Sequence, residues 1–207
     1  MQRVVLDTCV LFPNYLRDTL LRLAEAELYE PLWSPDILAE LTKNVGERIG
    51  ADKAKRLVDA MADTFRESLV TGYAALVLAM TNDPKDRHVL AAAVCGQAHA
   101  VVTLNVKDFP VEAADPYDIE VLRPDDFLLD LLDLLDLLDL LDLLDLLDLL
   151  DLLDLLDLLD LAPVEVASVL RAQAGSYRRE PRDLHGLLDR LDAGGAPQFA
   201  AEFRRRL

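Results

Sequence analysis

Acidic side chains that directly follow short apolar runs are the part of this sequence best suited to chemistry. The β-branched run 4–6 leads into Asp7, and the apolar run 100–103 is soon followed by Asn105 and Asp108. An apolar run that ends in a carboxylate delivers that acid to the carboxyl edge of a sheet, where open α/β folds bind ligands. The pattern therefore predicts several oxygen ligands at one edge of a sheet.

Further acids are expected near the same edge. Glu40 lies on a helix that follows the second strand candidate, and Asp83 and Asp86 lie at or before the start of an alanine-rich helix. Hard oxygen ligands of this kind suit Mg²⁺ or Mn²⁺. One or two such ions can activate water and stabilise a leaving oxygen during phosphodiester hydrolysis. We expect that chemistry here.

Each acid also has a purely structural interpretation. Asp7 and Thr8 could form only a side-chain turn. Asp83 and Asp86 could only cap a helix and favour its dipole, and Glu40 could be a solvated helix residue. Taken singly, the acids leave both interpretations open, but their shared placement at one edge favours a common site.

The elements that must position these acids alternate between strand-like and helix-like segments. Strands are expected at 3–6, 32–33, 100–103 and 120–122, and helices at 16–29, 35–44, 52–65 and 86–98. Ser34 is predicted to cap the helix that begins with Pro35. The sequence does not decide the secondary structure of the apolar stretch 75–80. The alternation indicates an α/β fold with βαβ units around a parallel sheet.

The triplet Leu-Leu-Asp is repeated through residues 128–161. Because three residues cover about 300° of an α-helix, each aspartate lies about 60° behind the last, and no fixed apolar stripe remains for docking. The period fits neither a membrane span nor a coiled coil, although leucine favours helix as the local state. Of two interpretations, an oligomerising arm and a tandem duplication in a tolerant helix, we favour the second.

Net charge, cysteines and hydropathy restrict the class of protein. The formal charge is −17, and removing the eleven aspartates of the repeat leaves −6. A polyanionic partner would therefore be held by metal ions and local basic residues. Cys9 and Cys95 lie in apolar runs and are expected to be buried free thiols. The lack of a secretory signal or an uncharged apolar span predicts a cytoplasmic protein without membrane contact.

Four segments share an order and spacing with one known family. They are VVLDT (4–8), ILAEL (37–41), DRHVLAAA (86–93) and VTLNVKDF (102–109). They resemble the PIN-domain family, and particularly VapC-type toxins with a C-terminal helical extension, over about residues 2–127. The resemblance implies a three-layer α/β/α sandwich with a central parallel sheet, and a Mg²⁺- or Mn²⁺-dependent endoribonuclease. It further implies RNA as substrate and a cognate antitoxin as partner. Apolar helices on both sides make a homodimer an additional expectation.

The resemblance assigns roles to matching positions. Asp7, Glu40 and Asp86 match the first three acids of the family. Asn105 stands where many members have the fourth acid, and Asp108 lies near enough to replace it. The catalytic residues implied are Asp7, Glu40, Asp86 and Asp108, and the metal ligands implied are these four together with Asn105.

Other residues are expected to serve the site indirectly. Thr8, Thr103 and Asp83 are assigned supporting roles, and Cys9 stands where the family usually has asparagine. His88 is expected in the core or beside the ligands, because metal-bound water already supplies the nucleophile. The candidates for phosphate contact, which flank the acids in sequence, are Arg17, Lys85, Arg87 and Lys107.

The sequence thus suggests three regions: a PIN-like nuclease domain at 1–127, the repeat at 128–161 and a helical C-terminal extension at 162–207, with helical pieces at 164–174 and at 183–191 followed by 199–206. The leading hypothesis is a metal-dependent endoribonuclease, the toxin of a type II toxin–antitoxin pair. A weakened PIN-like module that binds RNA or protein is the alternative, because Asn105 adds no negative charge. An aspartyl phosphatase would need an acid where Cys9 stands, and a dinucleotide site would need a glycine-rich turn.

Overall fold

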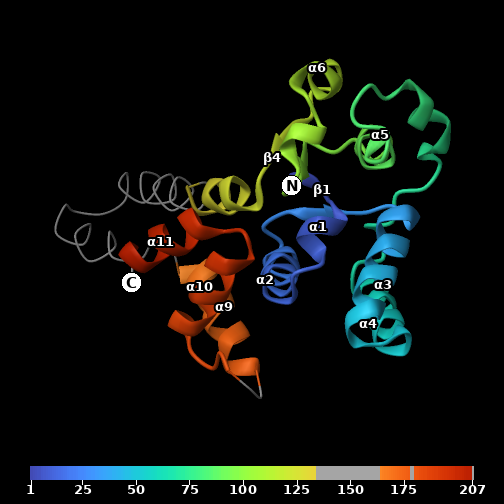
Figure 1. Cartoon of the computed structure of the whole chain (residues 1–207). Coiled ribbons are helices and arrows are strands. Elements are labelled where there is room, and N and C mark those ends of the chain that lie inside the picture. The colour runs from blue at the N-terminus through green and yellow to red at the C-terminus, as the bar shows by residue number, and fades with distance from the viewer. Residues whose placement is uncertain (134–163, 178–179, 207) are drawn as a thin grey trace, which may run out of the picture. The chain divides into compact units, whose positions relative to one another are not determined.

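The computed structural model describes residues 1–133, 164–177 and 180–206 (Figure 1). It divides into two compact units, Met1–Pro124 and Asp125–Leu207. The first unit ends close to residue 127, where the sequence suggests the end of the nuclease domain, while the division into three regions stays a prediction. Most of the Leu-Leu-Asp repeat, for which the sequence favours helix, lies outside the described residues.

A four-stranded parallel sheet forms the centre of the first unit. Its strands stand in the order β2 (Glu30–Leu32), β1 (Arg3–Leu6), β3 (Ala100–Val102) and β4 (Glu120–Leu122). Residues 4–6 and all of β3 are fully buried. Strands that are covered on both faces appear in a sequence as continuous apolar runs. This burial explains why the sequence marks the two central strands so clearly.

The connections between strands hold the helices of this unit. They are α1 (Thr8–Leu11), α2 (Asn14–Glu25), α3 (Pro35–Ile49), α4 (Ala51–Thr64), the 3₁₀ helix η1 (Tyr73–Ala79), α5 (Arg87–Cys95), η2 (Val106–Asp108), α6 (Val111–Ala114) and η3 (Asp115–Tyr117). In the sheet, β2 lies on one side of β1, and β3 and β4 lie on the other side. Right-handed crossovers then place α2 and α5 on opposite faces, as Figure 1 shows. The α/β/α fold expected from the sequence is confirmed.

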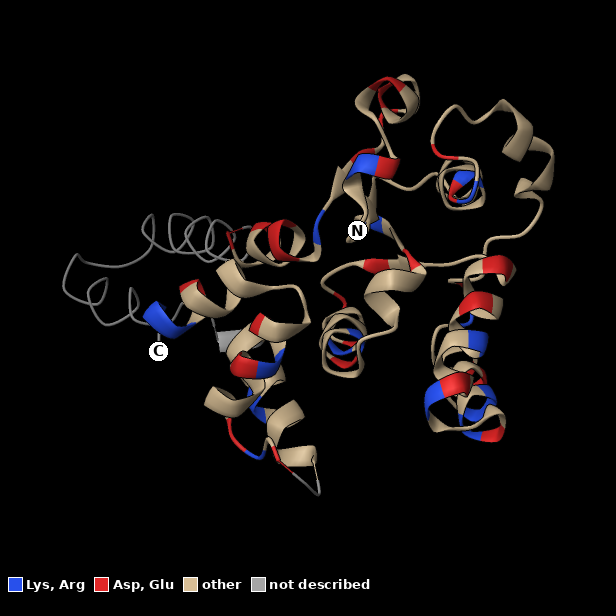
Figure 2. Ribbon diagram, in the orientation of Figure 1, with Lys and Arg blue, Asp and Glu red and all other residues tan. Residues whose placement is uncertain are grey.

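Local sequence signals explain several boundaries of these helices. The Ser34 hydroxyl accepts a hydrogen bond from the Ile37 N–H at 3.2 Å, as its predicted capping role requires. α3 extends to Ile49, five residues beyond the expected end, and Gly50 ends it with a φ of +92°. α2 ends before the expected residue 29, because Glu27 adopts a φ of +60°. Charged residues of both signs alternate along α3 and α4 (Figure 2), as on a solvated surface.

The two cysteines differ from the expectation of burial. Cys95 is exposed and Cys9 is only half-buried. Cys95 is the last residue of α5 and lies beyond the fully buried segment 89–93, so its thiol reaches only the carbonyl oxygen of Thr71, at 3.4 Å. The prediction of a buried thiol is therefore wrong for Cys95.

The second unit is helical where it is described. The chain is helical over 124–133, and three more helices follow: α9 (Val164–Ser176), α10 (Leu184–Gly194) and α11 (Pro197–Arg206). The sequence pattern grouped 183–191 and 199–206 as one helical piece, but Gly195, with a φ of +114°, separates them. In the described part of the chain, no helix is both long and apolar enough to cross a bilayer.

The start of the repeat packs better than its period predicts. Leu128, Leu131 and Leu132 are buried, because residues i, i+3 and i+4 of a helix share one face. The drift of the leucines around the helix accumulates only over a longer run. The expectation that no apolar stripe can dock is therefore wrong for the first two triplets.

Side chains from the first helical segment hold the last helix of this unit. The Asp125 carboxylate accepts hydrogen bonds from the backbone N–H groups of Gln198, at 3.0 Å, and Phe199, at 2.7 Å. These groups belong to the first turn of α11, where N–H groups lack partners within the helix. Near the other end of α11, the Arg206 guanidinium donates to Asp133 at 3.2 Å.

Candidate active site

Asp7 and Thr103 meet where two neighbouring strands end. The register pairs Leu6 with Val102, so the residues that follow lie side by side. The Thr103 hydroxyl donates to Asp7 Oδ2 at 2.6 Å, and the Asp7 N–H donates to the Val102 carbonyl at 3.1 Å. The Asp7 side chain lies at the point where the chain order reverses, which is where open α/β sheets bind ligands.

Cys9 takes part in the same cluster. Its thiol donates to Asp7 Oδ2 at 3.0 Å, lies 3.3 Å from the Thr103 hydroxyl and accepts the Leu104 N–H at 3.1 Å. Burial, helped by the Asp7 charge, raises the pKa of the thiol to about 12, so the thiol keeps its proton. Two donors thus fix one oxygen of Asp7. Within the described residues, the other oxygen, Oδ1, makes no hydrogen bond and stays available to a ligand.

Glu40 approaches this cluster from α3. Its side chain is 49% exposed, and its Oε2 atom accepts a hydrogen bond from the Thr8 hydroxyl at 2.9 Å. Its other oxygen, Oε1, lies 3.8 Å from Nε2 of His88. Thr8 thereby connects α3 to the end of β1, which is a geometry suited to the supporting role suggested for it.

Asp86 lies at the start of α5, yet its side chain makes no capping hydrogen bond. Its Oδ2 atom is buried and has no hydrogen-bond partner among the described residues. Burial is the main cause that raises the pKa of this carboxyl to about 6, and the Asp7 charge adds to it, while Lys85 acts in the opposite direction. The purely structural interpretation of Asp86 as a helix cap is therefore not supported.

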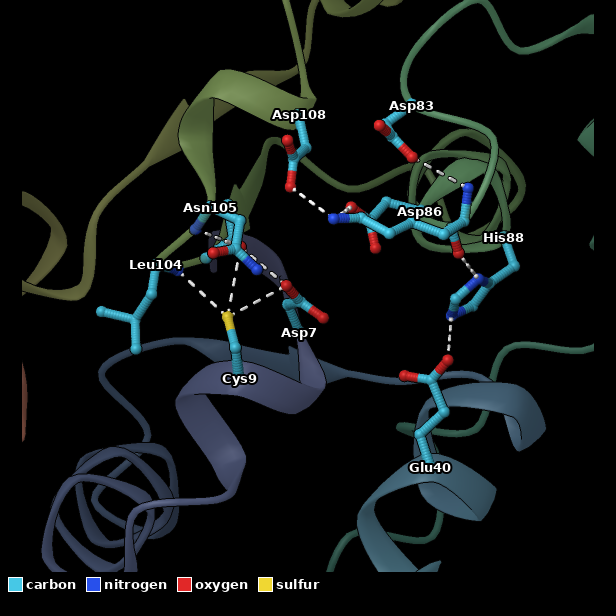
Figure 3. A network of polar contacts seen from close by, with 11 residues as sticks. Asp7, Cys9, Glu40, Asp83, Asp86, His88, Leu104, Asn105 and Asp108 are labelled. Atoms are coloured by element: carbon cyan, nitrogen blue, oxygen red, sulfur yellow. Dashed lines mark hydrogen bonds and ion pairs between the residues drawn. The ribbon is translucent and has the colours of Figure 1, made fainter. Parts of the chain in front are cut away.

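Asp83 and Asp108 are tied together around Lys85. The Lys85 ammonium donates to Asp108 Oδ2 at 3.0 Å and lies 3.8 Å from Asp86 Oδ2. Asp83 accepts the Lys85 N–H at 3.1 Å, and the Asp83 N–H donates to the Asp108 carbonyl at 3.0 Å. Figure 3 shows Asp83, Asp86 and Asp108 on this side of the site. Asp83 thus forms a local turn before α5 and does not cap that helix, which was its structural interpretation.

A cleft of about 620 Å³ collects half of the predicted site residues. Its lining includes Asp7, Thr8, Glu40, Lys85, Asp86 and Asn105 but neither Asp83 nor Asp108. Lys43 and Asn44 also line it and were not recognised from the sequence. Both follow Glu40 on α3 at helical spacings of three and four residues, which place them on the same face. This helical spacing is the sequence signal that could have identified Lys43 and Asn44 as residues of the site.

The donor chemistry of the cleft fits a divalent metal ion. The acids are carboxylates held close enough to raise the pKa of Asp86 through burial and mutual repulsion, and a bound cation relieves both costs. As the side chains stand, however, no three Asp, Glu, His or Cys residues in the described parts are arranged to hold an ion. Binding of a metal would therefore have to draw these side chains together.

One of the four candidates for phosphate contact is used inside the fold. Arg17 is 7% exposed, and its guanidinium donates to the Leu11 carbonyl at 2.7 Å and to Asn14 Oδ1 at 2.8 Å. The prediction that Arg17 contacts RNA is therefore wrong. Of the other candidates, Lys85 lines the cleft, whereas Arg87 is half-buried and donates to the Asn82 carbonyl at 3.3 Å. Lys107 is exposed but does not line the cleft.

Comparisons with known proteins agree with this architecture. The family model of the PIN domain matches residues 3–107, and that of the VapC50 C-terminal domain matches residues 153–205. The chain is 40% identical over 134 residues to "Putative ribonuclease VapC50" of Mycobacterium tuberculosis (strain ATCC 25618 / H37Rv), a match that covers 65% of this chain and 63% of that protein. No solved structure matches the chain. Because the PIN-domain match spans half of the sequence, the chain belongs to the PIN-domain family.

Proposed function

We propose that this chain is a divalent-metal-dependent endoribonuclease that hydrolyses RNA phosphodiester bonds. The observation that carries the proposal is the cleft lined by Asp7, Glu40 and Asp86, where a buried carboxylate oxygen of Asp86 has no hydrogen-bond partner among the described residues. Acids that repel one another in a cleft are suited to a cation and to the negatively charged substrate that the cation can hold. The name of the VapC50 relative, a ribonuclease, supports the same activity.

The proposed division of labour follows from the hydrogen bonds. Asp7, Glu40 and Asp86 would hold the ion, with Asn105 contributing its carbonyl oxygen in place of an acid. A bound Mg²⁺ or Mn²⁺ supplies charge neutralisation and an activated water molecule. Thr103 fixes the Asp7 carboxylate through its hydroxyl at 2.6 Å, which keeps the free oxygen aimed at the cleft.

Basic side chains at the cleft are proposed to bind the phosphate backbone. Lys85 and Lys43 both line it, from the start of α5 and from α3 respectively. Contacts of this kind position a nucleic acid without reading its sequence. We further propose that the protein is the toxin of a type II toxin–antitoxin pair in the cytoplasm, with a protein antitoxin as partner and a homodimer as its assembly. The similarity to VapC50 is the support for the toxin role.

The alternative is a PIN-like module that binds RNA or protein without cleaving it. Two observations favour it: Asn105 replaces an acid, and Asp108 is paired with Lys85 rather than turned into the cleft. Both lower the negative charge available to a second ion. The alternative therefore predicts RNA binding that does not depend on metal.

Cleavage of a mixed RNA substrate by the purified full chain tests the proposal. We expect cleavage with Mn²⁺ or Mg²⁺ and none with EDTA. We expect Asp7→Asn and Asp86→Asn to lose about 10²–10⁴-fold in rate, and Asp63→Asn, on the exposed side of α4, to match the wild type. Cleavage that persists in EDTA or in both site variants would refute the metal mechanism. A folded wild-type protein that binds RNA but neither cleaves it nor binds Mn²⁺ would establish the alternative.

A further inference from the structure

His88 lies beside the cleft and has no role in the proposed division of labour. It is the second residue of α5, and its imidazole is 14% exposed. Nδ1 lies 3.0 Å from the carbonyl oxygen of Lys85. Because a carbonyl oxygen only accepts hydrogen bonds, Nδ1 must carry the proton. In the neutral ring, Nε2 is then left with an unshared electron pair.

That electron pair faces a second acceptor. Nε2 is buried, has no hydrogen-bond partner among the described residues and lies 3.8 Å from Oε1 of Glu40 (Figure 3). The Glu40 carboxylate can only accept, and its other oxygen is already held by the Thr8 hydroxyl at 2.9 Å. Two acceptors that face each other repel unless a proton or a metal cation lies between them.

We propose that His88 binds the catalytic metal ion through Nε2, together with Oε1 of Glu40. This inference rests on the proposed function, since it assumes that the cleft takes a metal. A histidine that donates its Nδ1–H to a backbone carbonyl is held as metal-bound histidines are held, with ring orientation and tautomer both fixed. The Oδ2 atom of Asp86 also lacks a hydrogen-bond partner within the described residues.

The ligand set has a consequence for the choice of metal. With Asn105 in place of an acid, the cleft holds one carboxylate fewer, and the nitrogen of His88 supplies a replacement. Mg²⁺ takes oxygen ligands and keeps much of its water, whereas Mn²⁺ accepts imidazole nitrogen more readily. Binding through His88 therefore favours Mn²⁺ over Mg²⁺.

Electron spin-echo envelope modulation of the full chain loaded with Mn²⁺ tests the inference, because it detects ¹⁴N bound directly to the ion. The chain has three histidines, His88, His99 and His185. We expect ¹⁴N modulation in the wild type, its replacement by a ¹⁵N signal when histidine is ¹⁵N-labelled, and its loss in His88→Gln. The matched control is His185→Gln, an exposed residue of the second unit, which should keep the modulation.

The outcomes separate failure of this inference from failure of the proposed function. Bound Mn²⁺ without ¹⁴N modulation in the wild type would overturn the histidine ligand and leave the metal-dependent nuclease standing. No binding of Mn²⁺ at all would overturn both. If His88→Gln does not fold, ¹⁴N modulation that persists in both His99→Gln and His185→Gln assigns the nitrogen ligand to His88.

Calorimetric titration gives a second, independent readout. We expect His88→Gln to weaken Mn²⁺ binding by about tenfold or more and Mg²⁺ binding by less, so that the preference for Mn²⁺ falls. An equal loss for both ions would contradict a nitrogen ligand and indicate a purely structural role for His88.

Discussion

Two groups of residues at the site, the strand wall and the loop wall, are built in opposite ways. The strand wall, made of Asp7, Cys9 and Thr103, is a closed cluster in which the hydroxyl, the thiol and one carboxylate oxygen satisfy one another. The loop wall, residues 82–88, contains four of the five buried side-chain atoms that lack a hydrogen-bond partner in the described part of the chain; the fifth is in Trp33. Such atoms cost about 1–3 kcal/mol each. The fold thus preorganises the strand wall and leaves buried polar atoms of the loop wall, Asp86 Oδ2 among them, without a hydrogen bond.

The largest effect on stability is expected from removing a hydrogen bond within the strand wall. Thr103→Val removes the donor at 2.6 Å from the buried Asp7 carboxylate and should lower the free energy of unfolding by about 2 kcal/mol. Chemical denaturation in EDTA measures this. Thr42→Val is the control, because the Thr42 hydroxyl bonds only the Leu38 carbonyl of its own helix. If Thr103→Val unfolds like the wild type, the strand wall is not the rigid side.

A substitution in the loop wall should have the opposite effect on the free energy of unfolding. Burial and repulsion raise the pKa of Asp86 to about 6, so its charge destabilises the metal-free protein at neutral pH. Asp86→Asn should therefore increase the free energy of unfolding at pH 7 in EDTA. The shift from 3.8 to about 6 corresponds to about 3 kcal/mol at full value. We expect about 1 kcal/mol, because solvent screens this part-exposed carboxyl.

The pH dependence of that gain follows from the sign of the shift. A carboxyl with a raised pKa in the folded protein binds its proton more tightly there than in the unfolded chain. Its destabilising effect is absent below about pH 4, develops as the pH rises toward 6 and is complete above it. Asp86→Asn and the wild type should therefore unfold alike at pH 4 and differ at pH 7. A gain that is equal at both values would contradict charge repulsion as its cause.

A smaller effect is expected from the lysine that sits among the acids. Lys85 lies 3.0 Å from Asp108 and 3.8 Å from Asp86, where it competes with a metal ion for the same charges. Lys85→Gln should raise the affinity for Mn²⁺ about fivefold, measured by calorimetry at low salt. Lys107→Gln, also exposed but without an acid partner among the described residues, should change it little. Weaker Mn²⁺ binding in Lys85→Gln would show that the lysine helps to build the site.

The sequence predicts the strand wall well for a physical reason. β1 and β3 are buried on both faces, so they appear as apolar runs whose ends can be located. Parallel pairing then brings the ends together, and Asp7 and Thr103 meet as expected. The same reasoning places Glu40 on the helix capped by Ser34. Strand ends and capped helices are determined by short-range patterns that a sequence displays directly.

The loop wall and the side chains around it follow from tertiary contacts instead. Whether Asp108 turns toward Lys85 or into the cleft depends on where the loop before α5 lies. Arg17 resembles a surface cation in sequence, but carbonyl oxygens at the end of α1 hold its guanidinium inside the fold. His88 shows the same limit, since the atoms facing its two nitrogens come from Lys85 and from Glu40 on a different helix.

The clasp between the two ends of the second unit leads us to expect that the number of Leu-Leu-Asp triplets after Asp133 is an almost neutral trait. Asp125 accepts a backbone N–H group at the start of α11, and Asp133 holds Arg206 near its end. Neither contact uses a residue of the later triplets. Chains with a few triplets more or fewer after Asp133 should therefore share one unfolding midpoint, and a midpoint that moves with each triplet would refute this neutrality.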